Sequence, residues 1–194
     1  MIRIGLLTSG GDCQALNAAM RGVAKGLLNS DQDVELYGFL DGYKGLIYGN
    51  YKTLAFSDFS GILTKGGTIL GSSRCPFKNM RDPDENGLDK VAAMKQNYYK
   101  LNLNCLVILG GNGTHKTANL LREEGLNIVT LPKTIDNDLA LTDHTPGYGS
   151  AAKYIGTSVK EIIRDSFCLE YSKGLVTIVE IMGRNAGWLT GAAA

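Results

Sequence analysis

The sequence predicts an α/β fold with a mainly parallel sheet and helices on both of its faces. Strand-like and helix-like stretches alternate along the 194 residues, and glycine-rich turns follow two of the strand-like stretches. The predicted strands span 3–8, 34–40, 105–109, 127–131 and 175–181, and the predicted helices span 15–29, 86–101, 114–124 and 148–166. Turns at the carboxyl ends of such strands collect on one edge of the sheet, where open α/β sheets bind ligands.

The first two elements are predicted from an apolar run that ends in a glycine pair. The run 4–7 leads to Gly10 and Gly11, and the alanine-rich stretch 15–20 that follows is typical of a helix. A second unit of this kind is clearer. Residues 105–109 have the character of a buried strand, residues 110–114 form a glycine-rich turn, and the helical periodicity that follows stops at Gly125.

Both turns suit a phosphate group. Glycines let the backbone approach a ligand closely, and the free N–H groups in the first turn of a helix attract anions. Neither turn has the spacing of the phosphate loop that ends in Gly-Lys-Ser/Thr, or of the dinucleotide fingerprint. A third glycine- and serine-rich loop, 66–73, leads to Arg74, whose guanidinium can donate two parallel hydrogen bonds to phosphate oxygens. For each motif taken alone, a purely structural turn or a solvated arginine remains the alternative.

The segment 131–138 predicts an active site. In an extended run, Thr134, Asp136 and Asp138 lie on one face, and Lys133 lies on the other. Two carboxylates so close together repel each other unless a metal, a cation or a substrate hydroxyl offsets the repulsion. The alternative is a pair of turn aspartates without a role.

Together these motifs resemble the phosphofructokinase family over the whole chain. Five segments match in the family's order: 8–12 with 17–19, 66–74, 110–114, 132–138 and 182–184. The resemblance implies the family's Rossmann-like large lobe, which binds the phosphoryl donor. It implies a 6-phosphofructokinase of glycolysis that uses ATP, fructose 6-phosphate and Mg²⁺. It further implies a cytoplasmic, allosteric enzyme that is a homodimer or homotetramer at full length.

The resemblance also assigns roles to individual residues. It implies that Asp136 is the general base for the 1-hydroxyl of the sugar, that Thr134 holds the transferred group, and that Asp138 orients the sugar or the metal. The implied donor contacts are Gly11, Arg74, Cys75, Gly111, Asn112, Gly113 and Thr114, and Arg74 also stabilises charge on the moving group. The implied sugar-phosphate contacts are Thr134, Asp136, Asp138, Met182, Gly183 and Arg184. Arg21 and Lys25 match basic positions that bind an allosteric nucleotide in some relatives, and a solvated helix face explains them as well.

Three positions depart from the family's commonest patterns, Asn112, Lys133 and Lys173, and Gly113 bears on the choice of donor. Asn112 stands where most members that use ATP have an aspartate as the magnesium ligand, and an amide oxygen is a weaker ligand for this ion. Members that use diphosphate usually have an aspartate in place of Gly113 and a lysine like Lys133. An aspartate there would repel the α-phosphate of a nucleotide, so Gly113 favours ATP and diphosphate is the alternative. Lys173 is the substitute for an arginine that reaches a neighbouring subunit in many bacterial members.

Composition excludes several classes of protein. The formal net charge is only +1, so no overall field attracts nucleic acid or a membrane surface. The four cysteines Cys13, Cys75, Cys105 and Cys168 lack CxxC spacing, which favours reduced thiols in the cytosol. Neither a signal peptide nor an 18-residue apolar run is present.

The end of the sequence predicts a helix beginning near residue 185 that stops without a cap at Ala194. Because family members are longer, we expect residues 1–194 to be the donor-binding lobe of a protein with a second, sugar-phosphate lobe. Trp188 packs either in the core or against that lobe. A nucleotide-binding module without turnover is the alternative function, either because Asn112 weakens metal binding or because the second lobe is missing.

Overall fold

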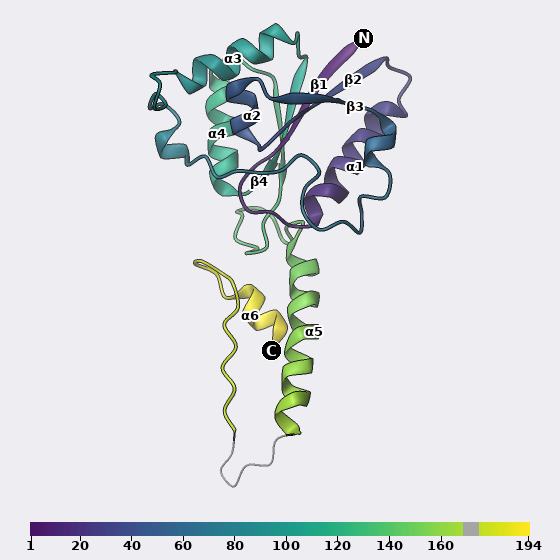
Figure 1. The fold of residues 1–194 in the computed structure, drawn as a ribbon, viewed down its shortest axis with the longest axis vertical. Helices are drawn as coiled ribbons and strands as arrows, with labels where there is room; N and C mark the ends of the chain where they lie inside the picture. Colours follow the sequence, from purple (N-terminus) through teal and green to yellow (C-terminus); the bar gives the residue numbers. More distant parts are fainter. Residues whose placement is uncertain (169–174) are drawn as a thin grey trace. The chain divides into compact units, whose positions relative to one another are not determined.

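The computed structural model describes residues 1–168 and 175–194 (Figure 1). The chain divides into two compact units, Met1–Lys133 and Thr134–Ala194. The first unit contains the whole sheet, and the second contains a long helix and a short one. Each unit is described by itself below.

A five-stranded sheet forms the centre of the first unit. The strands are β1 (Ile2–Thr8), β2 (Val34–Phe39), β3 (Tyr51–Leu54), β4 (Cys105–Gly110) and β5 (Ile128–Pro132), in the order β3-β2-β1-β4-β5. All neighbouring pairs are parallel except β2 and β3. The predicted mainly parallel α/β sheet is therefore confirmed, while the antiparallel edge strand β3 was not predicted.

The strand order creates a switch point beside β1. The chain passes from β1 to β2 on one side, and β4 then pairs with the other side of β1. In open α/β sheets the crevice outside the carboxyl ends of two such strands is the usual ligand site. In this protein those ends are Thr8 of β1 and Gly110 of β4.

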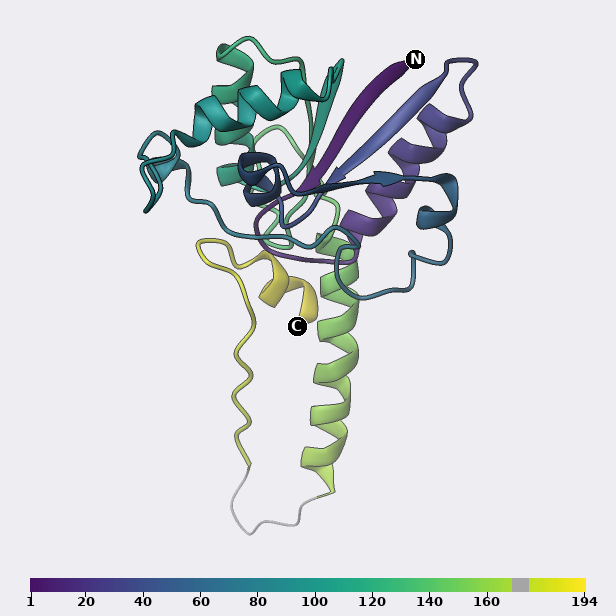
Figure 2. The same ribbon diagram turned by 45° about the horizontal axis from the view of Figure 1, so that its top comes forward.

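Helices cover both faces of the sheet, as predicted. They are α1 (Ala15–Leu28), α2 (Tyr43–Tyr48), α3 (Lys90–Lys100) and α4 (Asn112–Glu123), with 3₁₀ turns η1 (Phe56–Phe59) and η2 (Phe77–Asn79). Both views show α1 on one side of the sheet and α2, α3 and α4 on the other (Figures 1 and 2). Two apolar clusters match this division: α1 and η1 contribute to one, and α2, α3 and α4 contribute to the other.

Strand β4 is buried from both sides, which explains its continuous apolar run. Leu106 and Ile108 belong to the cluster under α2, α3 and α4, whereas Val107 and Leu109 belong to the cluster under α1. The alternation follows from the two-residue period of a strand. Burying each such side chain stabilises the fold by about 1.5–3 kcal/mol, so β4 anchors both layers.

Helix α3 begins at Lys90, later than the predicted residue 86. The carboxylate of Asp89 caps it by accepting hydrogen bonds from the N–H groups of Val91 (2.9 Å) and Ala92 (3.0 Å). Upstream, the carboxylate of Asp84 accepts a hydrogen bond from the Leu88 N–H at 2.9 Å. This second carboxylate holds the preceding residues in a turn rather than a helix.

The second unit contains α5 (Tyr148–Phe167) and α6 (Trp188–Ala193), which confirms both predicted helices. The strand predicted at 175–181 is wrong, because these residues are not assigned to any strand. Val176 and Ile178 are 83% and 91% exposed. A strand needs a neighbour for its backbone groups, and no other strand occurs among the described residues of this unit.

Candidate functional site

The ends of β1, β4 and β5 are joined by hydrogen bonds at the switch-point edge of the sheet. The Ser9 N–H donates to the Leu109 carbonyl at 2.9 Å, and the Lys133 N–H donates to the Gly110 carbonyl at 2.9 Å. The buried Thr114 hydroxyl donates to the Ser9 carbonyl at 3.3 Å. The two turns that the sequence singled out therefore lie side by side, as predicted from the α/β pattern.

Helix α4 presents free backbone donors at this edge. It begins at Asn112, two residues before the predicted start, and its first helical bond runs from the His115 N–H to the Gly111 carbonyl at 3.0 Å. The N–H groups of Asn112, Gly113 and Thr114 therefore have no partner within the helix. No side chain of the described residues caps this end. With the helix dipole, these donors form a site that favours a phosphate group.

The glycines of the two turns differ in what surrounds them. A Cβ atom built on Gly11 or Gly113 would meet nothing within 4 Å, so both face open space. In contrast, a Cβ on Gly110 would lie 2.4 Å from the Thr114 hydroxyl oxygen. Gly110 is therefore needed for packing, whereas Gly11 and Gly113 leave room for a ligand.

Tyr43 contacts the first turn of α4, and the sequence analysis did not identify this residue. Its ring is fully buried, and its hydroxyl donates to the Thr114 carbonyl at 2.7 Å. Burial raises the pKa of Tyr43 far above its usual value, so the hydroxyl stays a donor. No sequence signal marked this residue, because the contact spans 71 positions.

The loop 66–73 attaches to the first glycine turn and ends at Arg74. The Gly10 N–H donates to the Ser73 carbonyl at 3.2 Å, which places the start of Arg74 beside this turn. The Arg74 side chain is exposed, and within 1–168 and 175–194 it has no ion pair or hydrogen bond. Cys75 is half-buried, with its sulfur 3.7 Å from the Ser73 hydroxyl oxygen.

Lys133 is buried, with only 5% of its surface exposed. Its ammonium donates to the Gly11 carbonyl, so it attaches the end of β5 to the first glycine turn. Burial raises the pKa of the Cys13 thiol and outweighs the nearby positive charge of Lys133, which lowers it. The thiol is therefore not activated as a nucleophile.

His115 lies in the first turn of α4 and is half-buried. Burial lowers the pKa of its imidazole, which outweighs the opposite effect of a hydrogen bond with the Gly110 backbone. Its Nε2 atom is buried and has no hydrogen-bond partner among the described residues. The neutral imidazole is therefore the favoured form at this edge.

The proposed catalytic triplet lies in the second unit, and the prediction that it is extended is wrong. The Asp136 N–H donates to the Thr134 hydroxyl oxygen at 3.1 Å, which closes a local turn. Asn137 then adopts a left-handed conformation with φ 52°. Alternation of side chains requires extended backbone, so Thr134, Asp136 and Asp138 do not share a face by that rule.

Residues further along the chain hold this turn. Thr134 forms an isolated parallel bridge with Gly147. The Asn137 side-chain oxygen accepts a hydrogen bond from the Thr145 N–H at 2.9 Å, and the Thr145 hydroxyl donates to the Thr134 carbonyl at 2.9 Å. Thr145 is buried, while Asp138 is exposed. The turn that carries Asp136 is thus fixed by side chains eight to eleven positions away.

The other predicted sugar-phosphate residues, Met182, Gly183 and Arg184, are all exposed. Gly183 has φ 154°, and a Cβ there would lie 2.4 Å from the Ala186 carbonyl oxygen, so this turn requires glycine. Trp188 is 60% exposed and is not a core residue. Lys173 lies outside the described residues.

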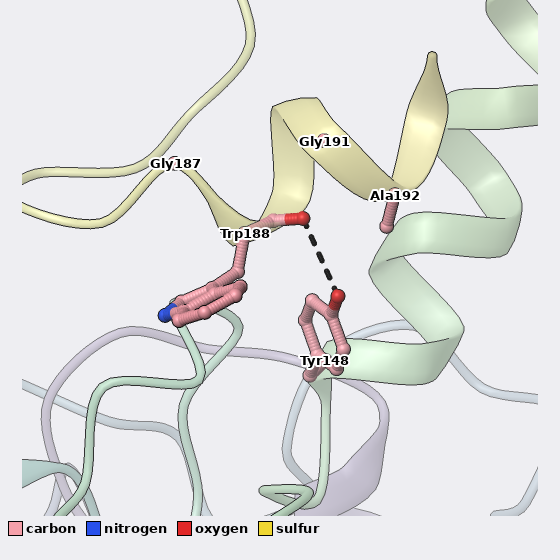
Figure 3. A pocket seen from close by; sticks show the side chains of 5 residues that line it. All are labelled: Tyr148, Gly187, Trp188, Gly191 and Ala192. Atoms are coloured by element: carbon pink, nitrogen blue, oxygen red, sulfur yellow. Dashed lines mark hydrogen bonds between the residues drawn. The ribbon is translucent and has the colours of Figure 1, made fainter.

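An open hollow of about 590 Å³ lies in the second unit (Figure 3). It is lined by Tyr148, Gly187, Trp188, Gly191 and Ala192. The Tyr148 hydroxyl donates to the Trp188 carbonyl at 3.3 Å, which joins the start of α5 to the start of α6. None of the predicted site residues lines this hollow.

The two possible effector residues on α1, Arg21 and Lys25, differ in their contacts. The Arg21 guanidinium donates to the Phe59 carbonyl and so joins α1 to η1. Lys25, one turn further along, is exposed. Arg21 therefore has a structural contact of its own.

Asn112 is the residue on which a metal was predicted, and its side chain is exposed at the first turn of α4. No group of three or more His, Cys, Asp or Glu residues that could hold a metal occurs in the part of the chain that is described. One amide oxygen fits a Mg²⁺ that the phosphates of a donor and water coordinate, because this ion usually takes few ligands from the protein. Among the helices of the described residues, none combines the length and apolar character needed to cross a bilayer.

The family model described as phosphofructokinase matches residues 3–194. An ATP-dependent 6-phosphofructokinase of Spirochaeta thermophila is 49% identical over 190 residues, which cover 95% of this chain and 50% of that protein. A pyrophosphate–fructose 6-phosphate 1-phosphotransferase of Amycolatopsis methanolica is 38% identical over 189 residues, which cover 97% of this chain and 52% of that protein.

Among solved structures, that of phosphofructokinase from Saccharomyces cerevisiae matches with a TM-score of 0.83 and 29% identity, covering 97% of this chain and 27% of that one. The chain thus spans about half the length of the curated relatives it matches. Because the family model covers nearly the whole chain, this protein belongs to the phosphofructokinase family.

Proposed function

We propose that residues 1–194 carry the phosphoryl-donor half of a 6-phosphofructokinase, which transfers a phosphoryl group from ATP to the 1-hydroxyl of fructose 6-phosphate. The observation that carries the proposal is the uncapped first turn of α4, which lies beside the Gly10–Gly11 turn at the switch point of the sheet. The names of the relatives support the same reaction.

ATP is the proposed donor, with diphosphate as the alternative. Gly113 opens onto free space, where an aspartate would add charge and volume against an α-phosphate. Lys133 is the residue that favours diphosphate. However, its ammonium donates to the Gly11 carbonyl, and this structural contact is compatible with either donor. Relatives named for ATP and one named for pyrophosphate both match this chain.

On the donor side, we assign the phosphate contacts to the backbone of Gly11 and of residues 111–114, and to the side chain of Arg74. The α4 donors are fixed before a ligand arrives, so they need no reorganisation to stabilise charge on phosphate oxygens. The Arg74 side chain is exposed and has no partner among the described residues, so its guanidinium is available to donate parallel hydrogen bonds to phosphate oxygens. Cys75 adds packing beside it.

On the acceptor side, we assign Asp136 as the base. It takes the proton of the 1-hydroxyl as that oxygen bonds to the γ-phosphorus, while the bond from phosphorus to the bridging oxygen breaks and ADP leaves. Thr134 holds the transferred group and Asp138 orients the sugar. Met182, Gly183 and Arg184 bind the sugar phosphate. Support for these roles comes from the match of these motifs to the phosphofructokinase family, to which the chain belongs.

Mg²⁺ is the proposed cofactor, and Asn112 is the residue that would hold it, together with the phosphates of the donor. When bound, this ion neutralises charge on the phosphates. We further propose that the gene product is a cytoplasmic homodimer or homotetramer acting in glycolysis, with Arg21 and Lys25 as effector contacts. Family membership supports these assignments.

The test is a calorimetric titration of the 194-residue chain with ATP and with diphosphate, both in the presence of Mg²⁺. We expect the chain to bind ATP, and we expect Gly113→Asp to weaken ATP binding at least tenfold more than diphosphate binding. Opposed like charges cost several kcal/mol, and about 1.4 kcal/mol corresponds to tenfold in affinity. Gly26→Asp is the matched control, because Gly26 also faces open space but lies on α1.

The result that would contradict the proposal is binding of diphosphate alone, or binding of neither donor. A variant Gly113→Asp that binds ATP as the parent chain does would remove the argument from this position. Equal weakening by Gly26→Asp would show a general effect of charge rather than a contact at α4.

A further inference from the structure

Asn17 is a fully buried polar residue in the first turn of α1, with 0% of its surface exposed. Its side-chain amide donates to the carbonyls of Gly67 (2.6 Å) and Lys65 (3.4 Å). Its side-chain oxygen accepts a hydrogen bond from the Ile69 N–H at 3.0 Å. All three contacts go to the backbone of one loop, about 50 residues further along the chain.

The same loop is attached to the first glycine turn at its other end. The Thr8 hydroxyl donates to the Gly71 carbonyl at 2.8 Å, and the Ser72 hydroxyl donates to the Gly10 carbonyl at 2.7 Å. The Gly10 N–H in turn donates to the Ser73 carbonyl at 3.2 Å. Arg74 is the next residue, so the loop ends where the proposed donor contacts begin.

The loop depends on these contacts for its shape. Residues 65–73 belong to no strand or helix, so they lack the hydrogen bonds of regular structure. Gly67 has φ 80° and Gly71 has φ 71°, which are left-handed conformations that the rest of the backbone must hold in place. The Asn17 amide contacts the chain on both sides of Gly67 and therefore fixes the first of these bends.

We propose that Asn17 is a positioning residue for the phosphoryl donor: it orders the loop 65–73 so that Arg74 is held beside the Gly10–Gly11 turn. The inference rests on the proposed function, because it links the contacts of Asn17 to the binding of the phosphoryl donor. Asn17 itself touches no reacting atom. It acts through the loop, and the Thr8 and Ser72 hydroxyls act on the same loop from its other end.

A purely structural role would lower stability without a selective effect on the donor. The two roles are separated by Asn17→Ala and a matched control, Asn97→Ala. Asn97 also uses its side-chain amide to bind backbone carbonyls, those of Leu46 (2.8 Å) and Ile47 (3.1 Å), but it lies on α3 and binds the end of α2. Both variants leave carbonyls of a similar kind without a donor.

Urea unfolding first identifies a temperature at which each variant is folded. At that temperature, calorimetry measures ATP binding and mass spectrometry measures backbone hydrogen exchange. For Asn17→Ala we expect ATP affinity to fall by about tenfold or more, the effect of losing one charge-assisted contact. Exchange should rise in residues 65–74 and stay unchanged in β4. Asn97→Ala should keep the ATP affinity of the parent chain and the protection of 65–74.

Ser72→Ala provides a milder second variant if Asn17→Ala does not fold. It removes only the bond to the Gly10 carbonyl, and we expect a few-fold loss of ATP affinity with faster exchange in 65–74. The proposal is overturned if the parent chain binds ATP while the Asn17 or Ser72 variant that folds binds it equally well. It is also overturned if Asn97→Ala weakens ATP binding as much. A parent chain that binds neither ATP nor diphosphate would instead refute the proposed function, which distinguishes the two failures.

Discussion

The two units of this protein differ in how they hold their functional residues. In Met1–Lys133, two apolar clusters enclose the sheet, and residues such as Leu6, Leu16 and Phe39 are completely buried. Among the described residues of Thr134–Ala194, Leu189 is the one buried hydrophobic side chain, and no residue of α5 is buried. The donor groups therefore lie on a packed framework, whereas Asp136 lies on a turn held mainly by hydrogen bonds.

The two units therefore differ in how firmly their neighbouring residues fix the candidate site residues. Near α4, packed neighbouring residues hold the first turn of the helix in place. That turn has open space at Gly113 and no side-chain cap from the described residues. Around Asp136, the local turn is defined by Thr134, Asn137 and Thr145, but exposed residues such as Met182 and Arg184 make no comparable framework. The fold therefore fixes the donor groups, whereas the acceptor residues are assigned by their match to the family's motifs.

The largest expected effect concerns the core of the first unit. Leu6→Ala removes a completely buried side chain from the central strand β1, and we expect a loss of about 2–5 kcal/mol in the free energy of unfolding. Ile163→Ala on α5, where the side chain is 51% exposed, should change it by less than about 0.5 kcal/mol. Urea unfolding of both variants measures the contrast, and equal losses would show that α5 is covered in solution.

The second prediction challenges the view that the poorly packed unit matters less. If Asp136 is the base, Asp136→Ser in the gene product that carries this sequence should lower kcat by at least about 10², or about 2.7 kcal/mol, with the KM for ATP changed only a few-fold. Steady-state kinetics measures both constants. A variant that keeps more than a tenth of the parent kcat contradicts the assignment.

The third prediction concerns a helix cap within the packed unit. Asp89→Ala removes the acceptor for the Val91 and Ala92 N–H groups, and we expect a loss of about 0.5–2 kcal/mol in the free energy of unfolding. Asp82→Ala is the control, since Asp82 is exposed in the loop that precedes α3. Thermal and urea unfolding should rank the two variants in this order, and the reverse order would refute the cap.

The smallest expected effect uses the two histidines, one in each unit. Burial lowers the pKa of His115 below its ordinary 6.5, so the unfolded chain takes up this proton first as the pH falls. The stability contributed by the neutral form is complete above about pH 6.5 and is lost as the pH falls toward the lowered pKa. His115→Gln should flatten stability against pH in this window.

His144→Gln is the control for this pH dependence, because His144 is exposed in the second unit. The contrast between the two variants below about pH 6.5 isolates the contribution of the buried imidazole. Chemical unfolding at several pH values measures the slopes. A steeper loss of stability for His115→Gln than for the parent would mean that the imidazole is charged in the folded state.

The sequence predicted the elements whose signals are local. Strand β4 is an unbroken apolar run followed by glycines, and α4 has helical periodicity that ends at Gly125, so both were found within two residues. The edge strand β3 was missed, because only Leu54 of its four residues is buried and no alternation shows. The strand predicted at 175–181 failed because pairing depends on a neighbour that composition does not reveal.

The candidate site shows the same limit. The Gly10–Gly11 and Gly111–Thr114 turns were placed together correctly, since parallel strands end at one edge. The shape around Asp136 was not, because Asn137 adopts a left-handed conformation and binds Thr145 eight positions away. The contacts of Asn17 with a loop about 50 residues distant, and of Tyr43 with Thr114, are likewise tertiary and leave no periodic signal.

The exposed stretch 175–182 has a consequence for handling the protein. Leu175, Val176, Ile178 and Met182 are between 48% and 91% exposed, and the stretch is rich in β-branched residues and contains no proline. Such segments template intermolecular strand pairing, the first step toward aggregates. Glu180 is the one charge within it and opposes that pairing. We therefore expect this stretch, rather than unfolding of the sheet, to promote aggregation when the protein is concentrated.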